Sequence, residues 1–444
     1  MRHASTSAHD TAGLVAASVL LVVAMVFGGG PRGMGDLVVH VAMLPCIAFA
    51  ILRWRAHEAT RLQRWFLAWW WFALAVIALQ LVPLPPALLR ALPERASVLA
   101  DLAQAGLPDA WHPMTLDSWA TLRALIAVAT FGTAWMLAVT LSAEAQRRTL
   151  MIGLATATVL ALFGFAQAAG GVHAPRFHPY HHNAGALGGF ANRNHFAALL
   201  AMCLPIALAF AAQAQRDGKR GNAAIAFGVA ALLWLAAALT YSRAGFLLAS
   251  LSLIVSSLVL WWPRGEGVRA WRAPLLVVGA TLLAVGHYAW DGLVKRLEQD
   301  PLDDARWDYL RNGMRVFHDF LPLGSGMGSF PWVNAPYEAV TELSPVFAER
   351  AHNDLLQVGI EAGVPGLALV ALFIVFMFVV VARNFPMGRA GRTPDHAIRS
   401  VIAVALAVPL LHSLVDYPLR TYAVAVLAGL LLAAGMRRDR HARA

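Results

Sequence analysis

The stretch LLQVGIEAGVPGLALVALFIVFMFVVV, residues 355–381, indicates what class of protein this is. Glu361 is its single charged residue, and as a helix the run is long enough to cross a hydrocarbon layer of about 30 Å. Apolar runs of about 17 to 25 residues recur along the chain, separated by short polar breaks. The sequence therefore predicts an all-α polytopic membrane protein.

The composition agrees with a membrane protein and excludes other classes. Hydrophobic residues make up 59% of the 444 residues and charged residues 14%, against about 25% in an ordinary soluble domain. The mean hydropathy is +0.60. Cys46 and Cys203 both fall in apolar runs, which leaves no disulfide framework and no cysteine-based metal site. The net charge of +10 does not indicate nucleic-acid binding, because the arginines are spread over many loops.

We expect about twelve transmembrane helices, with boundary errors of about 2 to 4 residues. The first run has a short basic start but no cleavage-site pattern after it, so we interpret it as an uncleaved first span. The expected spans are 12–27, 37–52, 65–82, 119–141, 149–169, 195–213, 223–240, 244–262, 273–290, 355–381, 398–414 and 421–436.

The positive-inside rule gives an orientation with both termini in the cytosol. That orientation places most arginines in cytosolic loops, and it leaves two long segments on the outer face, 83–118 and 291–354. The second is a large loop on the outer face, between helices 9 and 10. The expected organisation is thus 1–290 for helices 1 to 9, 291–354 for the large loop, and 355–444 for helices 10 to 12 with a basic cytosolic tail.

Three arginines oppose the charge bias, since they lie at the outer ends of spans. Arg193, Arg243 and Arg420 either reach to lipid headgroups or, for Arg420, pair locally with Asp416. Alternatively they bind an anion, because a guanidinium contacts phosphate oxygens with two hydrogen bonds and stays charged.

The large loop carries further candidates for anion binding. Arg306, Arg311 and Arg315 lie on an expected helix together with acidic residues that neutralise part of their charge. The segment LGSGMGSF, residues 323–330, has three alternating glycines that permit either close approach of an anion or tight turns. A serine hydrolase using Ser325 and His352 is disfavoured, because the chain has no G-x-S-x-G elbow.

Polar residues cluster where the large loop returns to the membrane. His352, Asn353, Asp354 and Gln357 begin the expected helix, and Glu361 lies about two turns deeper, where a carboxylate is costly unless it is paired. Asn353 or Asp354 would cap the helix in the simpler interpretation. In the functional one, His352 removes a proton from an alcohol. A further histidine group matches no standard metal-ligand spacing and is interpreted as a loop: His173, His178, His181 and His182.

At these positions the chain resembles the O-antigen ligase and O-antigen polymerase superfamily of bacterial inner-membrane glycosyltransferases. The motifs that carry the resemblance are Phe190-x-Asn-Arg-Asn-x-Phe-Ala197, Tyr241-Ser-Arg-Ala-Gly245, Arg306 followed by Pro322-Leu-Gly-x-Gly-x-Gly-x-Phe330, His352-Asn-Asp-Leu-Leu-Gln357, Glu361-x-Gly363 with Gly366, and Asp416-Tyr-Pro-Leu-Arg420. The resemblance implies a GT-C-like bundle of about a dozen helices with a large periplasmic loop between helices 9 and 10. It also implies a polyprenyl-pyrophosphate-linked glycan as donor, a glycan or lipid A-core type of acceptor, and a possible chain-length regulator as partner.

The chemistry of that transfer assigns provisional roles to the residues. His352 is the expected base, with Glu361 or Asp354 orienting it, and the transfer inverts the anomeric carbon. Arg243 and Arg306 are the expected pyrophosphate clamps, while Arg193, Arg311 and Asn353 are weaker candidates for binding donor or glycan. Because pyrophosphate leaves already ionised, no metal or other cofactor is expected. A ligase is slightly favoured over a polymerase, and a multi-span transporter or flippase is the alternative from another class.

Overall fold

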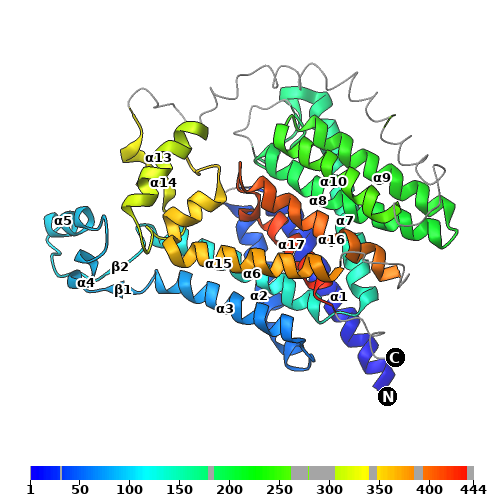
Figure 1. The fold of residues 1–444 in the computed structure, drawn as a ribbon, viewed down its shortest axis with the longest axis horizontal. Helices are drawn as coiled ribbons and strands as arrows, with labels where there is room; N and C mark the ends of the chain where they lie inside the picture. Colours follow the sequence, from blue (N-terminus) through cyan, green and yellow to red (C-terminus); the bar gives the residue numbers. More distant parts are fainter. Residues whose placement is uncertain are drawn as a thin grey trace.

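The computed structural model describes residues 2–30, 33–178, 185–261, 279, 306–339, 348–384 and 394–437. These residues are almost entirely helical, and a small two-stranded sheet joins β1 (Pro83–Leu84) to β2 (His112–Pro113) (Figure 1). The α-helices are α1 (Arg2–Phe27), α2 (Met34–Arg55), α3 (Arg61–Leu79), α4 (Pro86–Arg90), α5 (Ala96–Gln104), α6 (Ser118–Val139), α7 (Ala143–Gly170), α8 (Arg193–Arg216), α9 (Arg220–Leu239), α10 (Arg243–Trp261), α13 (Arg306–Asp319), α14 (Phe330–Asn334), α15 (Asp354–Asn384), α16 (Pro394–His412) and α17 (Tyr422–Gly435). Short 3₁₀ helices are η1 (Gly171–His173), η4 (Ala335–Tyr337) and η6 (Pro418–Arg420).

The helices confirm the all-α polytopic fold. Within the described ranges, 9 helices are long and apolar enough to cross a membrane: α1, α2, α3, α6, α7, α8, α9, α10 and α15. Each coincides with an expected span. The shorter apolar helices α16 and α17 occupy the last two expected positions. Apart from residue 279, the expected span 273–290 lies outside the described residues, as do parts of the large loop.

One helix forms the centre of the bundle. α8 is buried along nearly its whole length and packs against α9, α10 and α16. α17 is buried throughout and packs against α6, where a Cβ on Gly429 would lie only 2.7 Å from the carbonyl oxygen of Phe131. Glycine at such a contact lets two helix backbones approach closely, which is how helices associate where lipid removes the hydrophobic driving force.

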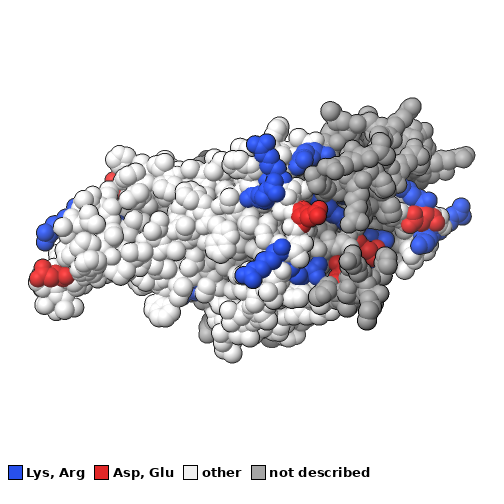
Figure 2. All heavy atoms as spheres, turned by 90° about the horizontal axis from the view of Figure 1, so that it is seen from below, with Lys and Arg blue, Asp and Glu red and all other residues white. Residues whose placement is uncertain are grey.

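The surface of the bundle suits a lipid environment. Large apolar side chains on spanning helices point outward and are more than half exposed, for example Val41, Phe72, Val159 and Phe378. The face in Figure 2 has a broad area almost without charged side chains between its left tip and its centre, and charged side chains lie at that tip and from the centre to the right. The start of α1 lies at one end of the molecule, while α4, α5, α13, α14 and the small sheet lie at the other, which we call the loop end (Figure 1).

α15 bends where it enters the bundle, and a loop compensates for the bend. Gly363 has φ +57° and ψ −147°, so the helical hydrogen bonding is interrupted there. Ser325 N donates to the carbonyl oxygen of Ile360 at 2.8 Å, and Gly326 N donates to that of Glu361 at 2.9 Å. The glycine-rich segment therefore satisfies carbonyls that the bend would leave without donors, as buried backbone in a membrane protein requires.

The glycines of this segment are needed for tight packing. Gly324, Gly326 and Gly328 have φ of +85°, +108° and +85°. A Cβ on Gly326 would lie 2.0 Å from Thr115 Oγ1, and one on Gly324 would lie 2.6 Å from the backbone of Glu361. The amides of residues 324–327 donate to acceptors of the protein itself. The sequence left two alternatives for this segment, tight turns or close approach of an anion. The structure shows the tight turns, because these amides are already bound to acceptors of the protein.

Gly326→Ala is expected to lower the apparent melting temperature of the detergent-purified protein well below that of Gly106→Ala. Both substitutions place alanine at positive φ, at a cost of roughly 1–2 kcal/mol, but Gly106 has nothing within 4 Å of an added Cβ. Overpacking against Thr115 adds about 1–3 kcal/mol at Gly326. Equal melting temperatures for the two variants would contradict the proposed packing role.

Candidate active site

Two arginines singled out in the sequence begin neighbouring helices. Arg193 is the first residue of α8, and Arg243 is the first residue of α10. The two helices are close at this point, because a Cβ on Gly245 would lie 2.3 Å from the Cβ of Ala197. Both arginines therefore stand at the same end of the bundle, where the positive ends of two helix dipoles also lie.

A buried carboxylate next to these helix starts contacts two histidines. Asp416, in the loop between α16 and α17, is 0% exposed. Its Oδ1 lies 3.4 Å from His352 Nδ1 and 3.4 Å from His195 Nε2. Tyr417 N donates to the same oxygen at 2.9 Å, and Asn194 Nδ2 donates to Oδ2. Asp416 thus connects α8, the segment before α15 and the loop between α16 and α17.

His352 is held by its backbone and by aromatic rings. Its φ is +50°, its ring stacks on Tyr309 of α13 at 5.8 Å between centroids, and the Tyr417 ring meets it edge-on at 5.2 Å. The side chain is 26% exposed, so a substrate can reach it. With Nδ1 facing Asp416, a neutral ring carries its proton on Nδ1 and offers Nε2 as a proton acceptor.

The electrostatics of the loop between α16 and α17 keep Asp416 ionised. Burial alone raises the pKa of the Asp416 carboxyl, but the side-chain hydrogen bonds from His195 and His352 hold that pKa well below its usual value. Burial and the nearby Asp416 charge raise the pKa of the Tyr417 hydroxyl to about 12. The site therefore combines an ionised carboxylate with a neutral phenol at neutral pH.

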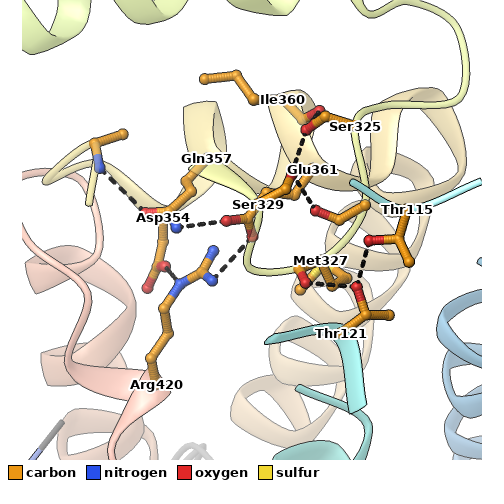
Figure 3. A network of polar contacts seen from close by, with 12 residues as sticks. Thr115, Thr121, Ser325, Met327, Ser329, Asp354, Gln357, Ile360, Glu361 and Arg420 are labelled. Atoms are coloured by element: carbon orange, nitrogen blue, oxygen red, sulfur yellow. Dashed lines mark hydrogen bonds and ion pairs between the residues drawn. The ribbon is translucent and has the colours of Figure 1, made fainter. Parts of the chain in front are cut away.

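A second buried network surrounds Arg420 (Figure 3). Arg420 Nε donates to Asp354 Oδ1 at 2.6 Å, and Nη1 donates to Glu361 Oε2 at 3.0 Å. Gln357 Nε2 donates to the other oxygen of Glu361 at 2.7 Å, and Ser413 Oγ donates to Asp354 Oδ2 at 3.0 Å. The fully buried Glu361 is thus paired, as a carboxylate at that depth requires.

These contacts correct two of the expectations. The arginine at the end of the Asp416-Tyr-Pro-Leu-Arg420 motif pairs with Asp354 and Glu361, and not locally with Asp416. Since both of those carboxylates bind Arg420, the carboxylate that faces the His352 imidazole within the described ranges is Asp416.

The remaining candidates occupy diverse positions. Asn353 caps α15, because its Oδ1 accepts from Leu356 N at 3.0 Å. Arg311 forms an exposed ion pair with Asp308 at 2.7 Å on α13. The Ser325 hydroxyl is buried and bonds to Ser329 and the carbonyl oxygen of Ile360. The side chain of Arg306, the first residue of α13, and the residues His181 and His182 lie outside what the structure describes.

Two arginines that the sequence did not single out also bear on the site. Arg95, 1% exposed, donates to the carbonyl oxygens of Met114 and Gly324 at 2.8 and 3.0 Å, and burial lowers its pKa to about 10. It ties the 83–118 segment to the glycine-rich segment. Arg350 lies over the Tyr417 ring, 5.9 Å from its centroid. Neither position had a motif that marked it. No group of three or more His, Cys, Asp or Glu among the described residues is arranged to hold a metal ion.

The fold and this site define a multi-pass membrane protein with a histidine, a buried carboxylate and arginines gathered at one end of its bundle. Residues 228–371 match the family model for O-Antigen ligase, which supports the resemblance to the O-antigen ligase and polymerase superfamily, a family of glycosyltransferase-like enzymes. The match includes His352 and Arg243, while Arg193 and Asp416 lie beyond it. No curated protein matches the chain.

Arg420→Gln is expected to destabilise the protein by about 3–5 kcal/mol, since it leaves the buried charge of Glu361 without its partner. Arg148→Gln is the control: that arginine pairs with Glu144 at 2.8 Å, but both side chains are more than half exposed, so the loss is under about 1 kcal/mol. Thermal unfolding in detergent checks both. Glu361→Gln introduced together with Arg420→Gln should recover part of the loss; a result with no recovery contradicts the pairing argument.

Proposed function

We propose that the protein is a membrane glycosyltransferase that moves a glycan from a polyprenyl-pyrophosphate carrier to an acceptor hydroxyl, as an O-antigen ligase does. The observation that carries this proposal is the arrangement of His352, whose Nδ1 faces the buried Asp416 while the rest of the ring is partly exposed at the loop end. A base held in this way, beside arginine-bearing helix starts, suits transfer from an anionic leaving group.

In the proposed reaction His352 acts as the general base. Its Nε2 takes the proton of the acceptor hydroxyl as that oxygen attacks the anomeric carbon. The bond from this carbon to the pyrophosphate oxygen breaks, the electron pair leaves with the pyrophosphate, and the configuration inverts. Asp416 stabilises the imidazolium that forms, and no general acid is needed because pyrophosphate leaves as an anion.

Positive charge for the departing pyrophosphate comes from arginines at the loop end. Arg243 is the proposed clamp from α10, with the N-terminal dipole of its helix directed at the same place. Arg306 is the proposed clamp from α13, and Arg193 and Arg311 are secondary candidates. Because Arg420 is saturated by two carboxylates, it is a poor candidate for binding an anion. The chemistry needs no metal ion or other cofactor.

The proposed setting is the periplasmic face of a bacterial inner membrane, in surface polysaccharide assembly. The lipid tail of the donor would remain in the bilayer while its sugar reaches the loop end, where a glycan or lipid A-core type of acceptor binds. A chain-length regulator would be a natural partner. Polymerisation of lipid-linked repeat units is the second candidate, because it uses the same base and the same clamps.

His352→Gln and Asp416→Asn are expected to abolish or lower transfer while folded protein is retained. Loss of a general base costs about 10²- to 10⁴-fold in rate, and Arg243→Gln should also reduce transfer. His318→Gln is the control, since that histidine is on α13 with an 85% exposed side chain. The measurement is complementation of a deletion strain, with surface glycans analysed on gels. If His352→Gln complements fully at normal expression, the assignment of the base is wrong.

The same deletion strain separates the two candidate functions. Mass spectrometry of its polyprenyl-linked intermediates should show long polymer on polyprenyl pyrophosphate and an unmodified acceptor, because a ligase acts after the polymer is complete. Single repeat units on the carrier would instead indicate a polymerase. Unchanged surface glycans would contradict both and favour the transporter class.

The orientation is tested by cysteine labelling, since Cys46 and Cys203 are buried. A cysteine at Asp109 should react with a membrane-impermeant maleimide in intact cells that have a permeabilised outer membrane. A cysteine at Asp217, in the turn between α8 and α9, should react only after the inner membrane is opened. The reverse pattern would place the proposed site on the cytosolic face.

A further inference from the structure

Asp416 contacts a second imidazole, which the proposed reaction does not use. His195, in the first turn of α8, is 3% exposed, and its Nε2 lies 3.4 Å from the same carboxylate oxygen that faces His352. The Tyr417 ring packs edge-on against both imidazoles, with centroids 4.6 Å from His195 and 5.2 Å from His352. Position 195 is not among the motif residues that carry the family resemblance.

We propose that His195 is a positioning residue for the base. It acts through Asp416: by donating to the carboxylate it fixes the oxygen that accepts the Nδ1 proton of His352, and it thereby keeps Nε2 of His352 free to take the acceptor proton. This inference rests on the transfer reaction proposed above.

The rigidity of α8 supports this role. Asp416 lies on a loop, whereas Asn194 and His195, which contact its Oδ2 and Oδ1, belong to the most deeply buried of the long helices described. These contacts fix the direction of the carboxylate relative to the bundle. If the His195 contact is lost, Oδ1 of Asp416 loses one of the groups that direct it toward His352, while Asn194 and the Tyr417 amide still bind the carboxylate. The imidazole can then move its proton to Nε2, the nitrogen that has to be unprotonated for catalysis.

In the proposed arrangement His195 serves as a neutral donor. With both histidines neutral, Asp416 gives the cluster a charge of −1, and uptake of a proton by His352 brings the sum to zero. A charged His195 would make the cluster neutral beforehand, so that proton uptake by His352 would leave an uncompensated buried positive charge. A neutral side chain that donates from the position of the imidazole Nε2 should therefore replace His195.

Glutamine and asparagine provide a matched pair of replacements. In His195→Gln the amide nitrogen can reach the position of the imidazole Nε2, while in His195→Asn it falls short of Asp416; both remain polar and uncharged. We expect His195→Gln to keep kcat within about threefold of the unmodified protein, a small part of a general base's contribution. We expect His195→Asn to lose about tenfold to a hundredfold in kcat with KM nearly unchanged. His318→Gln is again the exposed control.

Nitrogen NMR of histidine-labelled protein in lipid nanodiscs supplies a readout that does not depend on the substrate. The His352 signal is assigned by its absence in His352→Gln. His352 should be the Nδ1-protonated tautomer in the unmodified protein and in His195→Gln, and it should shift toward the Nε2-protonated tautomer in His195→Asn. An unchanged tautomer and rate in folded His195→Asn would overturn the inference, as would a folded His195→Gln that behaves like His195→Asn. If the proposed transfer reaction is wrong, neither the unmodified protein nor any variant has transfer activity. The comparison of His352 tautomers still decides whether His195 positions that ring.

Discussion

The ion pairs of Arg420 with Asp354 and Glu361 determine how the loop end is built. Glu361 is 0% exposed and lies two helical turns beyond the start of α15, where an unpaired carboxylate would be too costly to bury. Its partner comes from the far end of the chain, so the start of α15 has to stand against the loop between α16 and α17. The same contact brings Asp416, four residues before Arg420, to the place where His352 precedes α15.

The bend at Gly363 belongs to the same construction. A straight α15 would carry no free carbonyls at Ile360 and Glu361, and the glycine-rich segment would have nothing to bind there. With the bend, the amides of Ser325 and Gly326 donate hydrogen bonds to those carbonyl oxygens. The Arg95 side chain in turn donates to Gly324 and so attaches the 83–118 segment to the same loop. Main-chain hydrogen bonds therefore fasten the glycine-rich segment to the start of α15, and the Arg95 side chain fastens the 83–118 segment to the glycine-rich segment.

The sequence was sufficient to predict the spans but only part of the site. Apolar run length is a local property imposed by the bilayer, which is why the described helices occur where they were expected. Motifs also drew attention to His352, Arg243 and Asp416. The pairing of carboxylates was predicted wrongly, because closeness in sequence favoured Asp354 and Glu361 as partners of His352, whereas the pairing depends on contacts between segments about sixty residues apart. His195 was missed, since it stands at the start of an expected span and its contact with Asp416 depends on a segment more than two hundred residues away.

The buried network around Arg420 and the cluster around Asp416 each have a negative net charge, whereas the positive charge at the loop end lies on other arginines. Arg420 with Asp354 and Glu361 sums to −1, and Asp416 with two neutral histidines also sums to −1. An anionic substrate would be repelled by both unless positive charge stood in front of them. Arg193 and Arg243 begin helices beside Asp416, and Arg350 lies over the Tyr417 ring. In the proposed reaction, Asp416 therefore positions the base, while the arginines at the helix starts face the anionic substrate. The proposed base needs a carboxylate next to it, and the proposed pyrophosphate leaving group needs cations. Because the carboxylate and the arginines lie on separate elements, one site can provide both kinds of charge.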